Sequence, residues 1–470
     1  MAARPPDDVR DAAVDAAGGA SASEDGQDAA AAPVMRRAPF STNPRVGARG
    51  QRTQQRILDA ALVVFGQVGY HQCSIDRITK VAGCSRISFY QYFSSKEDVF
   101  RQLAGQVARQ ITASTEALDP VTPDLAGWTA LRAWVARYGD IHQRYLPVFA
   151  TFQSALDTDE AIAGGSLRAG QRTVAQFRDR LAATLLPTRR LDRTIDLLIK
   201  TMTTTFGIAT TLRTMTPGDY PRARVDDAVA DVAHRTLFGL QPEVNVHPPA
   251  DQPPPALAFG PAMMKVLEQR HDASALTPAG RRTLEALLRA GRSELVQRGY
   301  HGTRVDDISA AAELSHGAFY RYFDNKDHFA RLVAGEAMRT VSAAFAAIPT
   351  AAVHSGVGVT DDGAADGGAA ATALRAWLRE YNAAQASEAA LIRVWSDASF
   401  GDADLGGDSA AVLDWGRRQM AGFLRPRGFG DIDTEAVVLV ALLEVFGARH
   451  RSAAATDTAA TIIETGLLGR

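Results

Sequence analysis

The sequence predicts an all-α protein made of two tandem units, each with three short helices followed by a larger helical bundle. The first observation is a repeat: the run from Gly69 to Lys96 recurs without a gap as Gly299 to Lys326, 230 positions later. The second is that apolar residues behind each run recur at intervals of three and four, the period of an amphipathic helix. The third is that these regions lack the alternating pattern typical of strands. Together they indicate duplication of a whole helical unit.

Length and charge limit what this duplicated chain can bind. At 470 residues it exceeds what one hydrophobic core usually serves, so several domains are expected. A net charge of −2 argues against a uniformly basic coat for nucleic acid. Locally, residues 45–101 hold nine basic and four acidic residues, a surplus of +5, and residues 275–331 hold nine and seven, a surplus of +2. Both windows suit contact with phosphates, and the second is expected to bind more weakly.

Other classes of site and location find little support in the sequence. Cys73 and Cys84 give neither a disulfide framework nor paired metal-ligand spacing, and the histidines match no metal motif. We therefore predict no metal and no cofactor, and no catalytic residues, because no nucleophile with a base and no phosphate-binding glycine loop is evident. The first 44 residues lack the features of a secretory signal, and no apolar run reaches about 18 residues. The expected location is the cytoplasm, with no membrane partner.

Composition divides the chain. The opening segment has too few large apolar groups to order itself, seven prolines between positions 242 and 261 favour an extended connection, and a Gly/Ala/Asp-rich stretch reads as a surface loop. Leu131 to Trp134 return as Leu374 to Trp377 at an offset of 243, which places 13 added residues inside that loop. The predicted divisions are a disordered tail 1–44, a three-helix domain 45–105, a bundle 106–240, a linker 241–275, a second three-helix domain 276–335, and a second bundle 336–470 with a flexible loop near 351–370.

The first helix of each three-helix domain is predicted to act as a support. Its apolar face in the first copy consists of Ile57, Leu58, Ala61, Leu62 and Phe65, and the helix is expected to stop near Gly69. Ser74 is placed to cap a short second helix that ends at Gly83, where glycine allows a tight turn. Ser85 then caps a third helix, Arg86 to Tyr92, and a fourth begins at Lys96. Two short helices across such a turn form a helix-turn-helix, whose second helix fits the major groove of DNA.

The outward side of the third helix carries the candidate DNA contacts. Phe89 and Phe93 lie four apart and face the supporting helices, which leaves Arg86 to donate to guanine and Gln91 to pair with adenine. Tyrosine hydroxyls and Lys96 suit phosphates. The predicted contacts in the first copy are Ser74, Ser85, Arg86, Ser88, Tyr90, Gln91, Tyr92 and Lys96. Those in the second are Arg304, Ser315, His316, Gly317, Tyr320, Arg321, Tyr322 and Lys326, so its sequence preference should differ.

Some of these patterns also have purely structural interpretations. Each three-helix domain could simply pack, and Tyr90 and Tyr320 could be half-buried packing tyrosines. Aromatic residues of the bundles, such as Trp134 and Trp377, either line ligand pockets or form plain core. The second copy departs from the first where Glu313 replaces the turn glycine and where Gly291 and Arg292 interrupt the apolar face of the first helix, so we expect it to be less stable.

The motifs resemble those of the TetR/AcrR family of transcriptional regulators. The resemblance covers about 50 residues per copy, from Arg52 through Phe89-Tyr90 to Lys96-Glu97 and from Gly299 through Phe319-Tyr320 to Lys326-Asp327. It implies that the bundles bind a small, mostly apolar effector, pair two subunits, and release double-stranded operator DNA when the effector binds. The expectation is a ligand-released repressor that acts as a pseudo-dimer within one chain or as a homodimer. The alternative is a sensor or interaction scaffold in which only the first helix-turn-helix binds DNA.

Overall fold

The computed structural model describes residues 47–155, 160–181, 188–215, 220–239, 276–354, 366–399, 403–449 and 452–470. Within these ranges the regular secondary structure is helical, with one isolated bridge between Val121 and Leu181. The all-α prediction is therefore confirmed. The predicted tail 1–44 and linker 241–275 lie outside the described residues, as do residues 355–365 of the predicted loop. Helix α15, Thr350–His354, and the start of α16 at Asp366 lie within the segment 351–370 that the sequence predicts to be a loop.

The first three-helix domain consists of α1 (Ala48–Gln72), α2 (Ile75–Ala82) and α3 (Arg86–Tyr92). Regular helix in α1 is interrupted at Gly69, whose φ is +73°, so the predicted stop near this glycine is confirmed. Phe65, Phe89 and Phe93 are buried in one core under the three helices. This core fixes the orientation of α3.

The first bundle follows directly on this domain. Its helices are α4 (Lys96–Glu116), α5 (Leu125–Arg144), α6 (Leu146–Ala155), α7 (Glu160–Arg178), α8 (Arg189–Met215) and α9 (Arg222–Phe238). The three-helix domain contacts the bundle at α6, where Pro147 lies against Gly66 of α1.

The second half repeats this order. Its three-helix domain is α11 (Pro278–Gly302), α12 (Val305–Ala311) and α13 (His316–Phe319), and its bundle is α14 (Lys326–Ala346), α15, α16 (Asp366–Ser399), α17 (Ala403–Leu424), η3 (Arg425–Arg427), α18 (Ile432–Arg449), α19 (Ala453–Thr461) and the π-helical segment η4 (Ile462–Leu467).

One helix of the second bundle replaces two of the first. At the offset of 243, α16 covers both α5 and α6, which are separated at Tyr145. Pro147 lies in the first turn of α6, where its missing N–H breaks no hydrogen bond, whereas the equivalent position in α16 is Ala390. The proline thus accounts for the break in the first half and the alanine for the continuous helix in the second.

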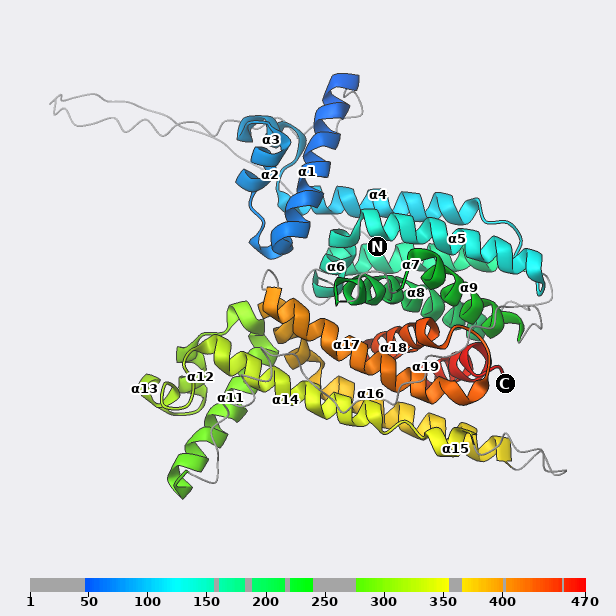
Figure 1. The fold of residues 1–470 in the computed structure, drawn as a ribbon. Coiled ribbons are helices and arrows are strands. Elements are labelled where there is room, and N and C mark those ends of the chain that lie inside the picture. Colours follow the sequence, from blue (N-terminus) through cyan, green and yellow to red (C-terminus); the bar gives the residue numbers. More distant parts are fainter. Residues whose placement is uncertain are drawn as a thin grey trace, which may run out of the picture.

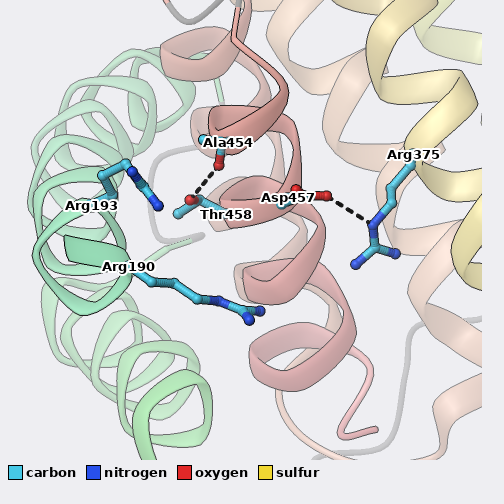
Figure 2. A pocket seen from close by; sticks show the side chains of 6 residues that line it. All are labelled: Arg190, Arg193, Arg375, Ala454, Asp457 and Thr458. Atoms are coloured by element: carbon cyan, nitrogen blue, oxygen red, sulfur yellow. Dashed lines mark hydrogen bonds and ion pairs between the residues drawn. The ribbon is translucent and has the colours of Figure 1, made fainter. Parts of the chain in front are cut away.

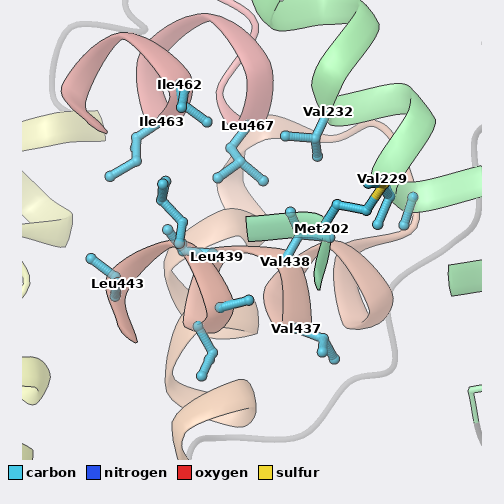
Figure 3. Packing of buried hydrophobic residues seen from close by; sticks show 14 of the residues in the cluster. Met202, Val229, Val232, Val437, Val438, Leu439, Leu443, Ile462, Ile463 and Leu467 are labelled. Carbon is cyan, nitrogen blue, oxygen red and sulfur yellow. The ribbon is translucent and has the colours of Figure 1, made fainter. Parts of the chain in front are cut away.

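The two bundles pack side by side, and both three-helix domains lie at the same end of them (Figure 1). Helix α8 packs on α18 and α9 packs on η4, with further contacts of α9 to α18 and of α8 to α19. One hydrophobic cluster runs through both bundles. Figure 3 shows its centre, where Met202, Val229 and Val232 of the first half meet Val437, Val438, Leu439, Leu443, Ile462, Ile463 and Leu467 of the second. Among the described residues, no helix combines the length and the hydropathy that a membrane span requires.

Candidate nucleic-acid interface

Local caps position the recognition helix of the first copy. The Ser74 hydroxyl accepts a hydrogen bond from the Arg77 N–H at 3.3 Å, and the Ser85 hydroxyl accepts one from Ser88 at 3.1 Å. Gly83 between the two helices has φ +61°, the left-handed conformation that glycine adopts without strain. The predicted caps and turn are confirmed. They hold α3 at a fixed angle to α2.

The predicted contact residues of the first copy lie mostly outside this core. Ser74, Ser85, Arg86, Tyr90 and Gln91 are exposed, whereas Ser88 and Tyr92 are half-buried. Phe89 and Phe93 on the opposite side are fully buried, as the spacing predicts. The helix therefore presents one polar side to solvent, as reading a groove requires.

Ile87 is a candidate contact that the sequence reasoning missed. Its side chain is 76% exposed, the largest value among the large apolar residues of the protein's described part. An exposed aliphatic group on a recognition helix suits the methyl group of thymine. Its exposure could have been predicted from the sequence, because Ile87 lies two positions before the inward-facing Phe89 on the helix and so points away from the core.

An ion pair across the turn positions Arg86. Its Nε lies 2.9 Å from Asp76 Oδ1 of α2, and both side chains are more than half exposed. The second copy keeps this arrangement, because His316 Nδ1 contacts Asp306 Oδ1 and both residues lie 230 positions after the first pair. An exposed pair of this kind contributes little to stability but orients a side chain that is predicted to contact DNA.

Lys96 and Lys326 have a structural role in addition to the predicted phosphate contact. Lys96 Nζ donates to the carbonyl oxygens of Tyr70 at 3.1 Å and Cys73 at 3.4 Å, and Lys326 Nζ donates to Tyr300 at 2.8 Å and Thr303 at 3.0 Å. Each ammonium also lies over the ring of that tyrosine. These bonds close the turn after the first helix, and phosphate binding by either lysine stays a prediction.

The second recognition helix is shorter than the first. Helix α13 spans four residues against seven in α3, and the Ser315 side chain makes no capping bond. Gly317 lies where the first copy has Ile87, and a Cβ there would meet nothing within 4 Å. Glycine is a poor helix former, and the N–H of Tyr322 bonds to Phe319 three residues back, which tightens the helix end. We call the exposed side of each recognition helix, which is predicted to contact DNA, the reading face. The two copies thus differ most at the centre of this face.

The remaining predicted contacts of the second copy fall into two groups. Arg304, Ser315, His316, Tyr320 and Arg321 are exposed, and Tyr320 retains 49% of its surface. Tyr322 is half-buried, and its hydroxyl donates to the carbonyl oxygen of Gly280 at 3.0 Å. Tyr322 therefore ties the recognition element to the start of α11.

Two departures of the second copy have different consequences. Glu313 has φ +57°, so a residue with a side chain occupies the left-handed conformation that Gly83 occupies in the first copy. The expected cost of this turn rests on that conformation and stays a prediction. Gly291 is no defect, because a Cβ there would lie 2.2 Å from Cζ of Phe329. The first copy has Ala61 and Val99 at these positions. A larger ring fills the space of the missing methyl group, so the interruption of the apolar face that the sequence predicts leaves no gap at Gly291.

Arg292 also has a partner that its sequence position does not reveal. Its Nη2 donates to Glu388 Oε2 of α16 at 2.7 Å, and Nη1 lies 3.9 Å from Glu336 of α14. The first copy has Leu62 and Tyr145 at the positions of Arg292 and Glu388. The contact between the three-helix domain and its bundle therefore includes an ion pair in the second half, beside the apolar packing of Leu391, at a position where the first half has apolar and aromatic side chains.

The first bundle holds an aromatic cluster beside a neutral histidine. The ring centroids of Tyr138 and Phe206 lie 6.4 Å apart, and those of His142 and Phe149 lie 4.6 Å apart. Burial lowers the pKa of His142 to about 4, and the charge of Arg222 lowers it further in the same direction. The Tyr138 hydroxyl bonds to Thr203 at 2.7 Å. In the second bundle, Phe345, Trp377, Tyr381 and Trp415 are buried against one another.

A groove of about 330 Å³ lies at the junction of the halves, beside α8 and α19 (Figure 2). It is lined by Arg190, Arg193, Arg375, Ala454, Asp457 and Thr458. Arg375 is engaged by Asp457 at 3.2 Å and by Glu464 at 2.8 Å, and Arg190 donates to the Thr461 hydroxyl at 2.9 Å. The groove is polar, so it does not match the mostly apolar effector that the family resemblance implies.

Comparison with known proteins finds the same domain twice. The model of bacterial regulatory proteins of the tetR family matches residues 57–103 and 287–333. The chain is 36% identical over 70 residues to YdgC, an uncharacterised HTH-type transcriptional regulator of Bacillus subtilis, 15% of this chain and 36% of that protein. It is 42% identical over 53 residues to the HTH-type transcriptional regulator AcrR of Shigella flexneri, 11% and 25% of the two chains. It is 40% identical over 55 residues to the fatty acid metabolism regulator protein of Bacillus subtilis, 11% and 28%.

These matches span between a quarter and just over a third of each relative's length. The two matched segments run from within α1 to within α4 and from within α11 to within α14, and they contain the exposed helix sides that are predicted to contact DNA. The chain therefore carries the helix-turn-helix domain of the tetR family of bacterial regulatory proteins twice, which is the arrangement of a tandem TetR-type regulator.

Proposed function

We propose that the protein is a transcriptional repressor that binds operator DNA through both helix-turn-helix domains and is released by a small, mostly apolar ligand. The observation that carries the proposal is the exposed side of α3, where Arg86, Ile87 and Gln91 face solvent while Phe89 and Phe93 anchor the helix. Arginine, glutamine and an aliphatic group are the side chains that read guanine, adenine and thymine in the major groove.

The arrangement of the two three-helix domains, here called the first head (α1–α3) and the second head (α11–α13), supports joint binding to one DNA site. Both project from the same end of the paired bundles (Figure 1). Dimeric helix-turn-helix proteins place two recognition helices in successive major grooves about 34 Å apart. Here one chain supplies both helices, and their contacts differ, so we expect an asymmetric operator with two unlike half-sites. Two chains with four heads are the other arrangement to be tested.

The effector proposal rests on the first bundle. The rings of Tyr138, Phe149 and Phe206 lie together in the bundle, Tyr138 and Phe206 in its interior, and His142 beside them stays uncharged near neutral pH because its pKa lies at about 4. A ligand that enters this interior would meet apolar groups and no charge on the histidine, which favours an apolar ligand over a charged one. Binding there acts next to α6, which contacts α1 of the first head. The expected location of the protein is the cytoplasm, where it would bind DNA.

One alternative has structural support: a sensor in which only the first head binds DNA. The second head has a shorter recognition helix, a strained turn at Glu313 and a smaller positive surplus. The test uses matched double variants, Arg86→Ala with Tyr90→Phe in the first head and Arg321→Ala with Tyr320→Phe in the second. Footprinting and binding titrations on the promoter of the neighbouring genes provide the readout.

If both heads bind, each double variant removes protection from one half-site and lowers affinity, and binding falls steeply with salt. An unchanged affinity for the second double variant would favour the sensor. No preference for any genomic fragment over random DNA would exclude operator binding itself. Release of the complex by a ligand, measured by titration of apolar compounds, tests the effector separately.

A further inference from the structure

Residues 230 positions apart meet at the centre of the face between the halves. Thr236 of α9 lies against Gly466 of η4, where an added Cβ would lie 2.1 Å from the Thr236 hydroxyl oxygen and 2.8 Å from the Val232 carbonyl oxygen. In a symmetric dimer a residue on the twofold axis meets its own copy. The centre of this face therefore has the geometry of a twofold axis, with threonine on one side and glycine on the other.

The charged contacts around this centre are one-sided. Arg224 of α9 donates from Nε and Nη2 to the two carboxylate oxygens of Asp431, each at 2.8 Å. Asp431 also caps α18 by accepting from the Thr434 hydroxyl at 2.8 Å. At the offset of 230, the reciprocal positions hold Ala454 and Thr201. The ion pair thus exists on one side of the axis and has no charged counterpart on the other.

A buried ion pair repeats this pattern. Arg235 Nη2 donates to Glu435 Oε2 at 2.5 Å, and its Nε donates to the Gly466 carbonyl oxygen at 2.8 Å. Glu435 has no exposed surface and also accepts from Arg427 at 2.7 Å. The positions reciprocal to Arg235 and Glu435 are Thr465 and Thr205. In each of these two ion pairs, the first half supplies the arginine and the second half supplies the acid.

We infer that the two halves form a complementary pair in which each half prefers the other to a second copy of itself. Two first halves would place Thr236 against Thr236, where the structure leaves room for a single hydroxyl, and would set Arg235 against Thr205. Two second halves would set Asp431 against Ala454, which removes its partner Arg224, and Glu435 against Thr465, which leaves Glu435 with Arg427 of its own half. Two first halves would likewise leave the buried Arg235 without Glu435. Loss of a charged partner from a buried or half-buried ion pair is destabilising, so both self-pairings are disfavoured.

The partner that fits this face is therefore the other half, in the same chain or exchanged between two chains. This inference does not depend on DNA or effector binding, because it concerns the pairing face alone. Its experiment is read out by mass, so failure of the pairing and failure of the proposed function are separable.

The test begins with the full chain carrying a specific protease site within residues 241–275. Differently tagged samples are cleaved, mixed, unfolded in urea, refolded and analysed by native mass spectrometry. Random pairing gives mixed and like pairs in equal amounts. We expect the ratio of mixed to like pairs to be at least about ten, which corresponds to a free-energy preference of about 1.4 kcal/mol for mixed pairing. Random proportions, or halves that separate and do not pair again, would overturn the inference.

A symmetrised variant identifies the cause. Arg224→Ala with Asp431→Thr makes both sides of the axis resemble Ala454 and Thr201 while keeping a capping hydroxyl at position 431. It should shift pairing at least severalfold towards random. The matched control is Arg132→Ala with Asp227→Ala, which removes an ion pair of 2.9 Å within the first half and should leave the ratio unchanged.

A second measurement needs no refolding. In the intact chain, Gly466→Thr should lower the melting temperature strongly because two threonines then meet, and the added Thr236→Gly should recover much of the loss. If the second substitution gives no recovery, the close approach at the axis is not what selects the partner, and the inference fails.

Discussion

Gly291 of α11 lies so close to Phe329 of α14 that a Cβ on the glycine would be 2.2 Å from the ring. The ring is fully buried and makes a T-shaped contact with the ring of Phe323, with centroids 4.8 Å apart. The core of the second head is thus built around the absence of one methyl group.

Gly291→Ala should therefore destabilise the second head by about 1–3 kcal/mol, as overpacking of a dense core does. Adding Phe329→Val recreates the Ala61 and Val99 combination of the first head and should recover most of the loss. Urea unfolding of the three proteins measures both effects. If Gly291→Ala alone is neutral, the ring has room to move and the explanation is wrong.

Glu313→Gly should stabilise the second head by about 1 kcal/mol, because it relieves a left-handed conformation at a residue with a side chain. Gly83→Glu is the mirror experiment in the first head and should cost a similar amount. Melting curves give both signs, and a loss of stability in Glu313→Gly would contradict the strain argument.

Ile87→Ala should weaken specific DNA binding by about 1 kcal/mol, roughly fivefold, through loss of contact with a thymine methyl. Stability should change by less than about 0.5 kcal/mol because the side chain is exposed. Binding to random DNA should not change. Leu125→Ala, at a similarly exposed residue of α5, is the control, and equal losses in both variants would point to an effect unrelated to the reading face.

Asp231 should make stability depend on pH. Burial is the largest cause that raises its pKa to about 7; Arg235 opposes the rise and Glu435 adds to it, while Trp128 Nε1 donates to its Oδ1 at 2.7 Å. The folded pKa lies above the unfolded one, so folding favours the neutral carboxyl. The contribution of Asp231 to stability is therefore largest below about pH 4, falls by up to about 1.4 kcal/mol per pH unit as pH rises towards 7, and levels off above.

Asp231→Asn keeps the acceptor for Trp128 and removes the titration. The difference in unfolding free energy between the two proteins should therefore grow from pH 5 to pH 7.5 in favour of the variant. Parallel curves would show that Asp231 does not titrate in this range.

The parts of the fold that depend on near neighbours in the sequence could be predicted. Ser74, Gly83 and Ser85 act within three or four residues of their own position, so the limits of α2 and α3 follow from local chemistry. The partner of Gly291 lies 38 positions away, and that of Arg292 lies 96 positions away. No short pattern encodes such distances, which is why the second head appeared defective in sequence.

The reading face was predictable in the same degree. Phe89 and Phe93 define the inward side by spacing alone, and the outward residues follow. Ile87 was missed because only polar side chains were considered as DNA contacts. The structural role of Lys96 could not be predicted, because the carbonyl groups that it bonds lie in a turn more than 20 positions earlier. Chemistry predicted from residue type is least complete where a side chain also holds the fold together.

The break at Pro147 gives the two halves unequal mechanics. Pro147 has no N–H to donate to the carbonyl oxygen four residues earlier, so a hinge motion between α5 and α6 breaks fewer helical hydrogen bonds than the same bend in a continuous helix. The bonds that remain at the junction join Tyr145 to Ile141 and Phe149 to Tyr145. The same bend in α16 would rupture bonds within an unbroken rod of 34 residues. The first three-helix domain therefore contacts a helix that follows a hinge, whereas the second contacts a continuous helix. A conformational change inside the bundles should therefore move the first three-helix domain, and its bound DNA, more readily than the second.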